Sequence, residues 1–386
     1  MIVMLKTVKS IRDIIQQKFL VVPVLVLLTG AMWLMIMVGA CTSEETVDPE
    51  NKTPTPLAWR KPANFPDPVY DLNKNPLTVE GVELGKFLFY DGLLSRTNVI
   101  GCGTCHQQQS AFTHHGHELS HGVDDQLGKR NTPSIQNMAW NPLFFWDGGV
   151  RDMDFVPFNP IENPVEMGET VNHVLEKLRL TPDNSAKIPV DYPKMFKAAF
   201  GTPDITTERM MKALSQFMTT MVSAESRYDK FAIGDVTALS AQEKDGLVLF
   251  RKNCSSCHEG ELFTSYGFRN NGLAPLKNED LGRFDVTRKE SDRNLFKVPS
   301  LRNVSFTAPY MHDGRYKTLG EVLIHYTDKV VSSPTLDPAF IQLNGKTGLN
   351  LTDDEKESII AFLRTLSDDN FIKNNAFSDP GIGNAF

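Results

Sequence analysis

Two copies of one cysteine-histidine pattern constrain this chain more than any other feature. The run Cys-Gly-Thr-Cys-His spans 102–106, and Cys-Ser-Ser-Cys-His spans 254–258. Four of the five cysteines lie in these two pentads, and the fifth is Cys41. A Cys-x-x-Cys-His pentad is typical of c-type haem attachment, in which two thiols bond to the haem and the histidine binds its iron. The sequence therefore predicts two covalently bound haem c groups.

Other uses of a Cys-x-x-Cys pair fit this chain less well. A zinc site would need a second pair of ligands near each copy, and no other cysteine is available to supply it. A redox-active dithiol would not need the histidine that follows each pair. The predicted attachment cysteines and proximal iron ligands are Cys102, Cys105 and His106 in the first pentad, and Cys254, Cys257 and His258 in the second.

The first forty residues differ from the rest of the chain. Basic residues precede a long apolar run that ends in Met-Val-Gly-Ala before Cys41. This pattern predicts a signal segment over 1–40. Its end resembles the lipobox of bacterial lipoproteins, so we expect a lipid on Cys41 to attach the protein to a membrane. An uncleaved membrane anchor is the alternative, because the run is long enough to span a bilayer. Either way, we expect the folded part in the periplasm or cell envelope.

Residues 41–57 are polar and contain proline, which predicts a flexible tether. The net charge of the whole chain is −7, and the signal segment carries +3, so −10 remains after its removal. An acidic body argues against nucleic-acid binding and suits a basic redox protein as partner.

The chain also repeats itself around the pentads. A helical pattern precedes each pentad, and a Pro-Ser-apolar-x-Asn run follows it, from Pro133 and from Pro299. An Asp-Gly pair lies fourteen residues beyond each of these prolines. Equal spacing of matched motifs indicates internal duplication. We therefore predict a mainly α-helical fold with two related cytochrome-c-like haem domains, over 58–235 and 236–386.

A long connecting helix is predicted between the pentads, over 206–231. Apolar side chains recur there at helical spacing, including Met210, Leu214, Phe217 and Met221. A methionine-rich stripe of this kind favours core packing over haem ligation.

The motifs together resemble the bacterial di-haem cytochrome c peroxidases and the related MauG-type enzymes, which oxidise side chains of a partner protein. The likeness runs from about Leu77 to Leu366. It rests on "GKRNTPSIQN", "FFWDGG", "PIENPVEMG", "KVPSLRN" and "TAPYMHDGRYKTL". The resemblance implies a peroxide-reacting N-terminal haem, an electron-transferring C-terminal haem, calcium between the domains and, in many members, a homodimer.

Several residues acquire roles only through this resemblance. Trp146 matches the tryptophan between the two haems, although a core aromatic is the alternative for such a residue. Glu166 matches the acid that moves the peroxide proton, although a solvated charge is the alternative. Asn131, Thr307 and Pro309 match the calcium ligands, and oxygen donors suit that cation.

The sixth iron ligands distinguish members of the family. In the C-terminal half, Tyr326 occupies the position where the peroxidases carry methionine and MauG-type enzymes carry tyrosine. Tyr326 shares a helix face with Leu319, Val322 and Leu323, so it points inward. His325 and Met311 are the alternatives. In the N-terminal half, His121 is the nearest match to a distal histidine, and an open iron site is the alternative.

Three functions remain open at this point. The first is reduction of hydrogen peroxide with electrons from an external donor, such as a small redox protein. The second is MauG-type oxidation of residues on a partner protein, which Tyr326 favours because an anionic oxygen ligand stabilises oxidised iron. The third is electron transfer without catalysis, which two fully ligated haems would favour and Glu166 argues against.

Overall fold

The computed structural model describes residues 53–181, 189–276 and 280–383. The predicted signal segment, Cys41 and most of the predicted tether lie outside these ranges. Thr53–Phe386 form one compact unit. Residues 53–57 pack against the start of the first described helix, where the Thr55 amide donates to Glu80 Oε2 at 2.7 Å. In the described ranges, no helix combines the length and apolar character that a membrane crossing requires.

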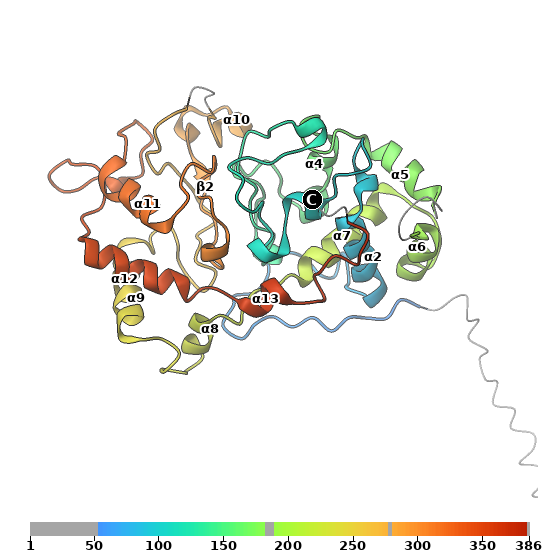
Figure 1. Ribbon diagram of the computed structural model, residues 1–386, viewed down its shortest axis with the longest axis horizontal. Helices are drawn as coiled ribbons and strands as arrows, with labels where there is room; N and C mark the ends of the chain where they lie inside the picture. The colour runs from blue at the N-terminus through green and yellow to red at the C-terminus, as the bar shows by residue number, and fades with distance from the viewer. Residues whose placement is uncertain (1–52, 182–188, 277–279, 384–386) are drawn as a thin grey trace, which may run out of the picture. The chain divides into compact units, whose positions relative to one another are not determined.

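The fold is mainly α-helical, as predicted (Figure 1). The α-helices are α2 Val79–Tyr90, α3 Cys102–Cys105, α4 Phe158–Glu162, α5 Val171–Arg179, α6 Tyr192–Phe200, α7 Thr207–Thr220, α8 Arg227–Ala232, α9 Ala241–Asn253, α10 Phe284–Thr287, α11 Leu319–Ile324, α12 Asp353–Arg364 and α13 Asp369–Lys373. Strands β1 Phe268–Arg269 and β2 Phe296–Lys297 form an antiparallel pair.

Local sequence signals determine where the functional helices begin. The Ser240 hydroxyl and the Glu243 carboxylate cap the start of α9 in a capping box. Thr318 and Glu321 cap the start of α11 in the same way. These two helices carry the residues that lead to the second pentad and to Tyr326.

The duplication appears in a repeated helix crossing. α2 packs on α7 in one half, and α9 packs on α12 in the other. A Cβ atom added at Gly85 would lie 1.9 Å from the carbonyl oxygen of Ala213. One added at Gly246 would lie at the same 1.9 Å from that of Ser358. Each half therefore needs a glycine at the crossing so that two helix backbones can approach closely.

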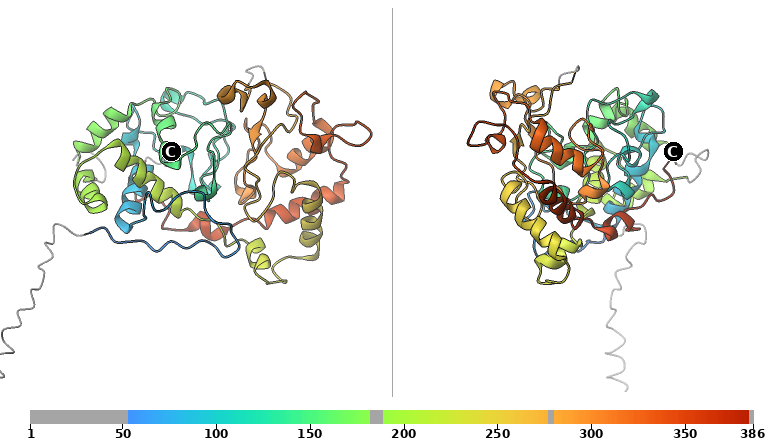
Figure 2. Two further views of the ribbon diagram at one scale, coloured as in Figure 1. Left: turned by 180° about the vertical axis from the view of Figure 1, so that it is seen from behind. Right: turned by 60° about the vertical axis from the view of Figure 1, so that its left-hand side comes forward.

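Each half has its own hydrophobic core. The first contains buried residues between Leu84 and Met221, and the second contains buried residues between Tyr228 and Leu366. After the second core, the C-terminal segment returns to the N-terminal half, where Phe371 and Phe377 pack into the first core. Figures 1 and 2 show this red C-terminal segment leaving α12 and lying against the N-terminal half.

The prediction of one helix over 206–231 is wrong, because α7 and α8 are separate. Between them, the Ser223 amide donates to Asn137 Oδ1 at 2.9 Å, and Asp368 Oδ2 accepts from two further amides of the break. Acceptors that are remote in sequence thus replace the carbonyls that would continue a helix. The predicted core role of the methionine stripe is confirmed, since Met210 and Met221 are fully buried.

A prediction follows for the two crossing glycines. Gly85→Ala and Gly246→Ala should each lower the free energy of unfolding by about 3 kcal/mol, because the new methyl group must displace backbone atoms. Gly320→Ala is a matched control within a helix, since the nearest atom to its added Cβ is 3.8 Å away. Guanidinium denaturation of the three variants measures the difference. Equal stability of all three would contradict a close helix crossing.

Candidate haem-binding site

Each pentad holds its histidine in the same way. Nδ1 of His106 lies 2.8 Å from the carbonyl oxygen of Phe112, and Nδ1 of His258 lies 3.1 Å from that of Phe263. Phe112 and Phe263 have positive φ angles of 61° and 52°, which turn the chain back towards the imidazole. A histidine that donates through Nδ1 presents the lone pair of Nε2, which is the form that binds a metal.

Burial determines the protonation of these groups. Desolvation lowers the pKa of both His106 and His258 to about 4, so both imidazoles are neutral near pH 7. Desolvation also raises the pKa of Cys102, Cys105 and Cys254 to about 12. Thiols of this kind do not suit a redox dithiol, whose reactive cysteine has a lowered pKa.

The arrangement of each pentad fits haem c. None of the four pentad cysteines forms a disulfide within the described residues. Across the described ranges, no group of three or more His, Cys, Asp or Glu side chains is placed to hold a metal ion. Each half instead offers two thiols and one neutral imidazole beside an apolar core, which is the donor set that covalent haem attachment requires.

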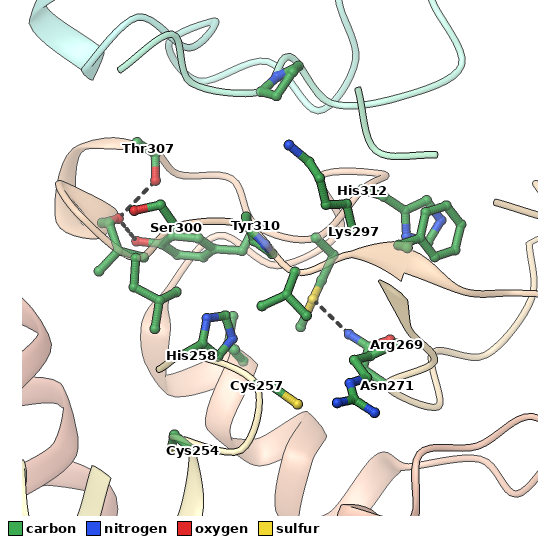
Figure 3. Close-up of a pocket in the computed structure, with 18 of the residues that line it drawn as sticks. Cys254, Cys257, His258, Arg269, Asn271, Lys297, Ser300, Thr307, Tyr310 and His312 are labelled. Atoms are coloured by element: carbon green, nitrogen blue, oxygen red, sulfur yellow. Dashed lines mark hydrogen bonds between the residues drawn. The ribbon is translucent and has the colours of Figure 1, made fainter. Parts of the chain in front are cut away.

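The second pentad opens into a large cavity (Figure 3). The cavity encloses roughly 1900 Å³ of atom-free space, counted out to its open mouth. Figure 3 shows His258 and Cys257 on one side of it, with Tyr310 and Lys297 across from them. Most of the lining is apolar, which suits the flat ring of a haem.

Tyr326 lines this cavity together with Leu319, Val322 and Leu323, the residues from which its inward direction was inferred. The helix changes here from α to π over His325–Lys329, a change that is frequent at functional sites. Burial raises the pKa of Tyr326 to about 12. The phenol therefore stays protonated near pH 7 unless a cation binds its oxygen.

His325 and Met311, the two alternative sixth ligands, already make hydrogen bonds to the same residue. His325 is 1% exposed, and its Nε2 lies 2.9 Å from the carbonyl oxygen of Asn271, so this nitrogen is already engaged. Met311 lines the cavity, and its Sδ lies 3.4 Å from Asn271 Nδ2, the contact drawn to the sulfur atom in Figure 3. Asn271 therefore contacts the ligating atoms of both alternatives, through its carbonyl oxygen for His325 and through its side-chain amide for Met311.

Glu166 lies beside the first pentad. Its Oε1 accepts a hydrogen bond from Asn163 Nδ2 at 2.8 Å, and its carbonyl oxygen accepts from the Val123 amide at 2.7 Å. Desolvation raises its pKa, and its charge in turn raises the pKa of Cys105. Glu166 is thus a partly buried carboxyl next to an attachment cysteine, not a solvated surface charge.

His121 lies near the same cysteine. Cys105 Sγ is 3.5 Å from the His121 carbonyl oxygen, and His121 Nδ1 is 2.7 Å from Asp125 Oδ1. The ring of His117 lies 4.6 Å from that of His121 and stacks on that of His114 at 4.2 Å. His114, His117 and His121 therefore gather beside the first pentad.

Trp146 connects the halves. It lines the cavity of the second pentad, yet its indole Nε1 donates to the carbonyl oxygen of Asn131 at 2.9 Å in the first half. Its own carbonyl oxygen accepts from the Lys297 amide at 2.7 Å. Trp140, not Trp146, is the tryptophan buried in a core, at 1% exposure.

The three residues matched to calcium ligands line the same cavity. Asn131 Nδ2 donates to the carbonyl oxygens of His117 and Glu118 at 3.2 and 3.1 Å, so Oδ1 is turned away from them. Within the part of the chain that the structure describes, no hydrogen bond reaches the carbonyl oxygens of Thr307 and Pro309. These three oxygens are the donors that the resemblance requires.

Comparisons with known proteins agree with this geometry. Residues 79–237 match the family described as di-haem cytochrome c peroxidase. The chain is 31% identical to methylamine utilization protein MauG of Methylorubrum extorquens, over 92% of this chain and 96% of that protein. It is 35% identical to cytochrome c551 peroxidase of Nitrosomonas europaea, over 76% and 82%. The chain belongs to the di-haem cytochrome c peroxidase family.

Solved structures of the family support the fold. A MauG-like protein associated with microbial copper homeostasis has a TM-score of 0.73 and 30% identity, over 84% of this chain and 99% of that one. The di-haem peroxidase BthA of Burkholderia thailandensis has a TM-score of 0.66 at 21% identity, over 79% of this chain and 91% of that one, which shows the fold alone. This di-haem peroxidase-family protein is therefore an oxidoreductase with two haem c groups, as the pentads predicted.

Sequence reasoning overlooked two features of this family member. Arg130 pairs with Asp147 at 2.5 Å and with Asp280 at 2.6 Å, which ties distant segments together. Lys297 lines the cavity, and its ammonium donates to the carbonyl oxygen of Leu143 at 3.1 Å. The sequence did contain a signal for Lys297. When the repeats "KVPSLRN" and "NTPSIQN" are aligned, Lys297 falls at the position of Asn131.

The attachment residues make a direct prediction. Cys102→Ala and Cys254→Ala should each leave one thioether bond at their pentad and weaken covalent haem retention there, and the double changes Cys102→Ala/Cys105→Ala and Cys254→Ala/Cys257→Ala should each remove one covalent haem. Mass spectrometry and the pyridine haemochrome spectrum of denatured protein count the haems. Cys41→Ala is the control and should keep two. Two covalent haems in either double variant would contradict the assignment.

Proposed function

We propose that this protein reduces hydrogen peroxide at the His106 half and receives electrons through the His258 half. The observation that carries the proposal is Glu166, a partly buried carboxyl beside Cys105 whose pKa burial raises. Peroxide reduction consumes two electrons and two protons and yields two waters. It therefore needs a group that moves a proton within the site and a separate route for electrons.

Glu166 supplies the proton transfer. When bound, the haem of the first pentad supplies the iron that binds the peroxide. The Glu166 carboxylate takes a proton from one peroxide oxygen and returns it to the other, so that the second oxygen leaves as water. The Asn163 side-chain amide donates to Oε1 at 2.8 Å. No described side chain donates to Oε2, so this oxygen is the one that accepts the peroxide proton. A raised pKa suits a group that must both accept and release this proton.

Trp146 and Tyr326 fit the electron route. Trp146 lines the second cavity and is hydrogen-bonded to Asn131 of the first half, which supports a role for it in electron transfer between the two halves. Tyr326 is our proposed sixth ligand of the second iron, with His106 and His258 as the proximal ligands. Electrons come from an external donor, and the net charge of −10 expected for the processed chain suits a basic redox protein.

A second function is MauG-type oxidation of a partner protein, which shares the first steps with peroxide. Tyr326 in the second cavity favours it, because a phenolate ligand stabilises oxidised iron. Two of the similar proteins are also named MauG or MauG-like. Electron transfer without catalysis is not favoured, because it gives no role to the partly buried Glu166.

Several finer assignments belong to the same proposal. Calcium is held by Asn131 Oδ1 and the carbonyl oxygens of Thr307 and Pro309. His121 is a distal ligand of the first iron in one state of the protein, and an open site is the alternative. The protein works in the periplasm or cell envelope, attached through lipid on Cys41, and a homodimer is in keeping with the family resemblance.

The acid makes a prediction about rate and pH. Glu166→Gln should slow the reaction with peroxide by about a hundredfold to ten-thousandfold, and leave both haem spectra nearly unchanged. Because burial raises the pKa of Glu166 and the carboxylate is the active form, the parent rate should fall with decreasing pH below a midpoint above the ordinary value for glutamate. Stopped-flow absorption measures both. A glutamine variant within twofold of the parent would remove Glu166 from the mechanism.

The sixth ligand makes a prediction about potential. If Tyr326 binds the second iron, Tyr326→Met should raise the reduction potential of that haem, because phenolate favours the ferric state. Met311→Leu is the matched control and should leave the potential unchanged. Spectroelectrochemical titration measures each value. The all-ferric parent should also react with peroxide directly. A parent that reacts only after addition of one electron would contradict Tyr326 ligation and point to His121 as a gate.

A further inference from the structure

The duplication pairs residues across the two halves. A shift of 166 residues places Pro133 on Pro299 and Asp147 on Asp313, the motifs that first revealed the repeat. The same shift places Asn131 on Lys297. It follows that the proposed calcium ligand of one half has a lysine as its counterpart in the other.

Reciprocal hydrogen bonds show that this pairing is real in three dimensions. The shift also places Trp146 on His312. The Lys297 amide donates to the carbonyl oxygen of Trp146 at 2.7 Å, and the Asn131 amide donates to that of His312 at 2.7 Å. Each half thus binds the other through equivalent atoms, as in a two-fold contact between identical subunits.

The proposed calcium site therefore has a counterpart in the other half of the chain, which we call the twin position. Its two carbonyl donors, Thr307 and Pro309, correspond under the same shift to Asn141 and Leu143. The Lys297 ammonium donates to the carbonyl oxygen of Leu143 at 3.1 Å. A side-chain cation thus meets the carbonyl that is the counterpart of a proposed calcium ligand.

The charge of Lys297 has no carboxylate partner nearby. In the described residues, no Asp or Glu oxygen lies within 4.0 Å of its Nζ, and the nearest acidic influence is the more distant Asp147. Desolvation lowers the pKa of Lys297 to about 8, so the ammonium still predominates near pH 7. Buried cations need oxygen acceptors, and carbonyl oxygens are also what calcium needs.

We propose that the Lys297 ammonium is a resident cation at the duplicated counterpart of the calcium site. The chain therefore binds one calcium, through Asn131, and fills the second position with its own side chain. This inference rests on the proposed calcium site. It explains why two halves that bind each other through equivalent hydrogen bonds differ at this residue, since asparagine offers an oxygen to a metal and lysine replaces the metal.

The substitution has a consequence for Trp146. The lysine amide binds the Trp146 carbonyl directly, so a fixed positive charge lies within one side chain's length of this contact. That charge does not depend on the supply of calcium. Removal of calcium should therefore loosen the His312 contact and leave the Trp146 contact in place.

The test exchanges the two residues in the holoprotein, which carries both haems. Calcium content is measured by atomic emission after dialysis against calcium, and by titration calorimetry after chelation. The parent should bind one calcium per chain. Lys297→Asn should bind two, because it supplies an oxygen and removes the ammonium. Lys297→Met is the matched control and should stay at one, since it removes the charge and supplies no oxygen donor.

The reverse exchange gives an independent measurement. Asn131→Lys should bind none, and the double variant with Lys297→Asn should bind one again. If the parent and Lys297→Asn each bind one calcium, the inference is overturned. It is also overturned if both Lys297 variants have altered haem potentials and their calcium content is unchanged. If the parent binds no calcium, the proposed calcium site at Asn131 is refuted. In that case, one calcium bound by Lys297→Asn would still support a cation position at Lys297.

Discussion

The hydrogen bond from each proximal imidazole to a phenylalanine carbonyl sets the requirements for the rest of the fold. The carbonyl must turn back on the pentad, so Phe112 and Phe263 adopt positive φ angles that cost energy in a bulky residue. Packing offsets that cost. Phe89 of α2 lies 6.2 Å from Phe112, and Phe250 of α9 lies 5.8 Å from Phe263, measured between ring centroids. The helices before each pentad are thus held in place by the loops after them.

The same scaffold serves two different sites because the halves diverge in what surrounds it. The first half places a desolvated carboxyl, Glu166, beside its attachment cysteine, whereas the second places a phenol, Tyr326, in its cavity. Neither feature disturbs the imidazole, its carbonyl partner or the helix crossing. Duplication therefore preserves the imidazole, its carbonyl partner and the helix crossing, while the side chains on the remaining faces of the two sites diverge.

Local and periodic features of this protein were predictable, and features that depend on distant partners were not. The pentads, the capping boxes at Ser240 and Thr318 and the repeated fold could all be read from short stretches of sequence. The break after α7 could not, because its acceptors, Asn137 and Asp368, lie far away along the chain. Nor could spacing alone show that Asn271 engages His325, a contact between segments that only folding brings together.

The two-fold pairing of the halves also limits how they can move. The backbone of Trp146 is held by the second half and that of His312 by the first, each through a 2.7 Å hydrogen bond. Gln136 and Arg302, which are also counterparts, add a third bond of 2.7 Å, from the glutamine side chain to the arginine carbonyl oxygen. A shift of one half must therefore strain all three contacts at once. These three contacts therefore couple the positions of the two halves.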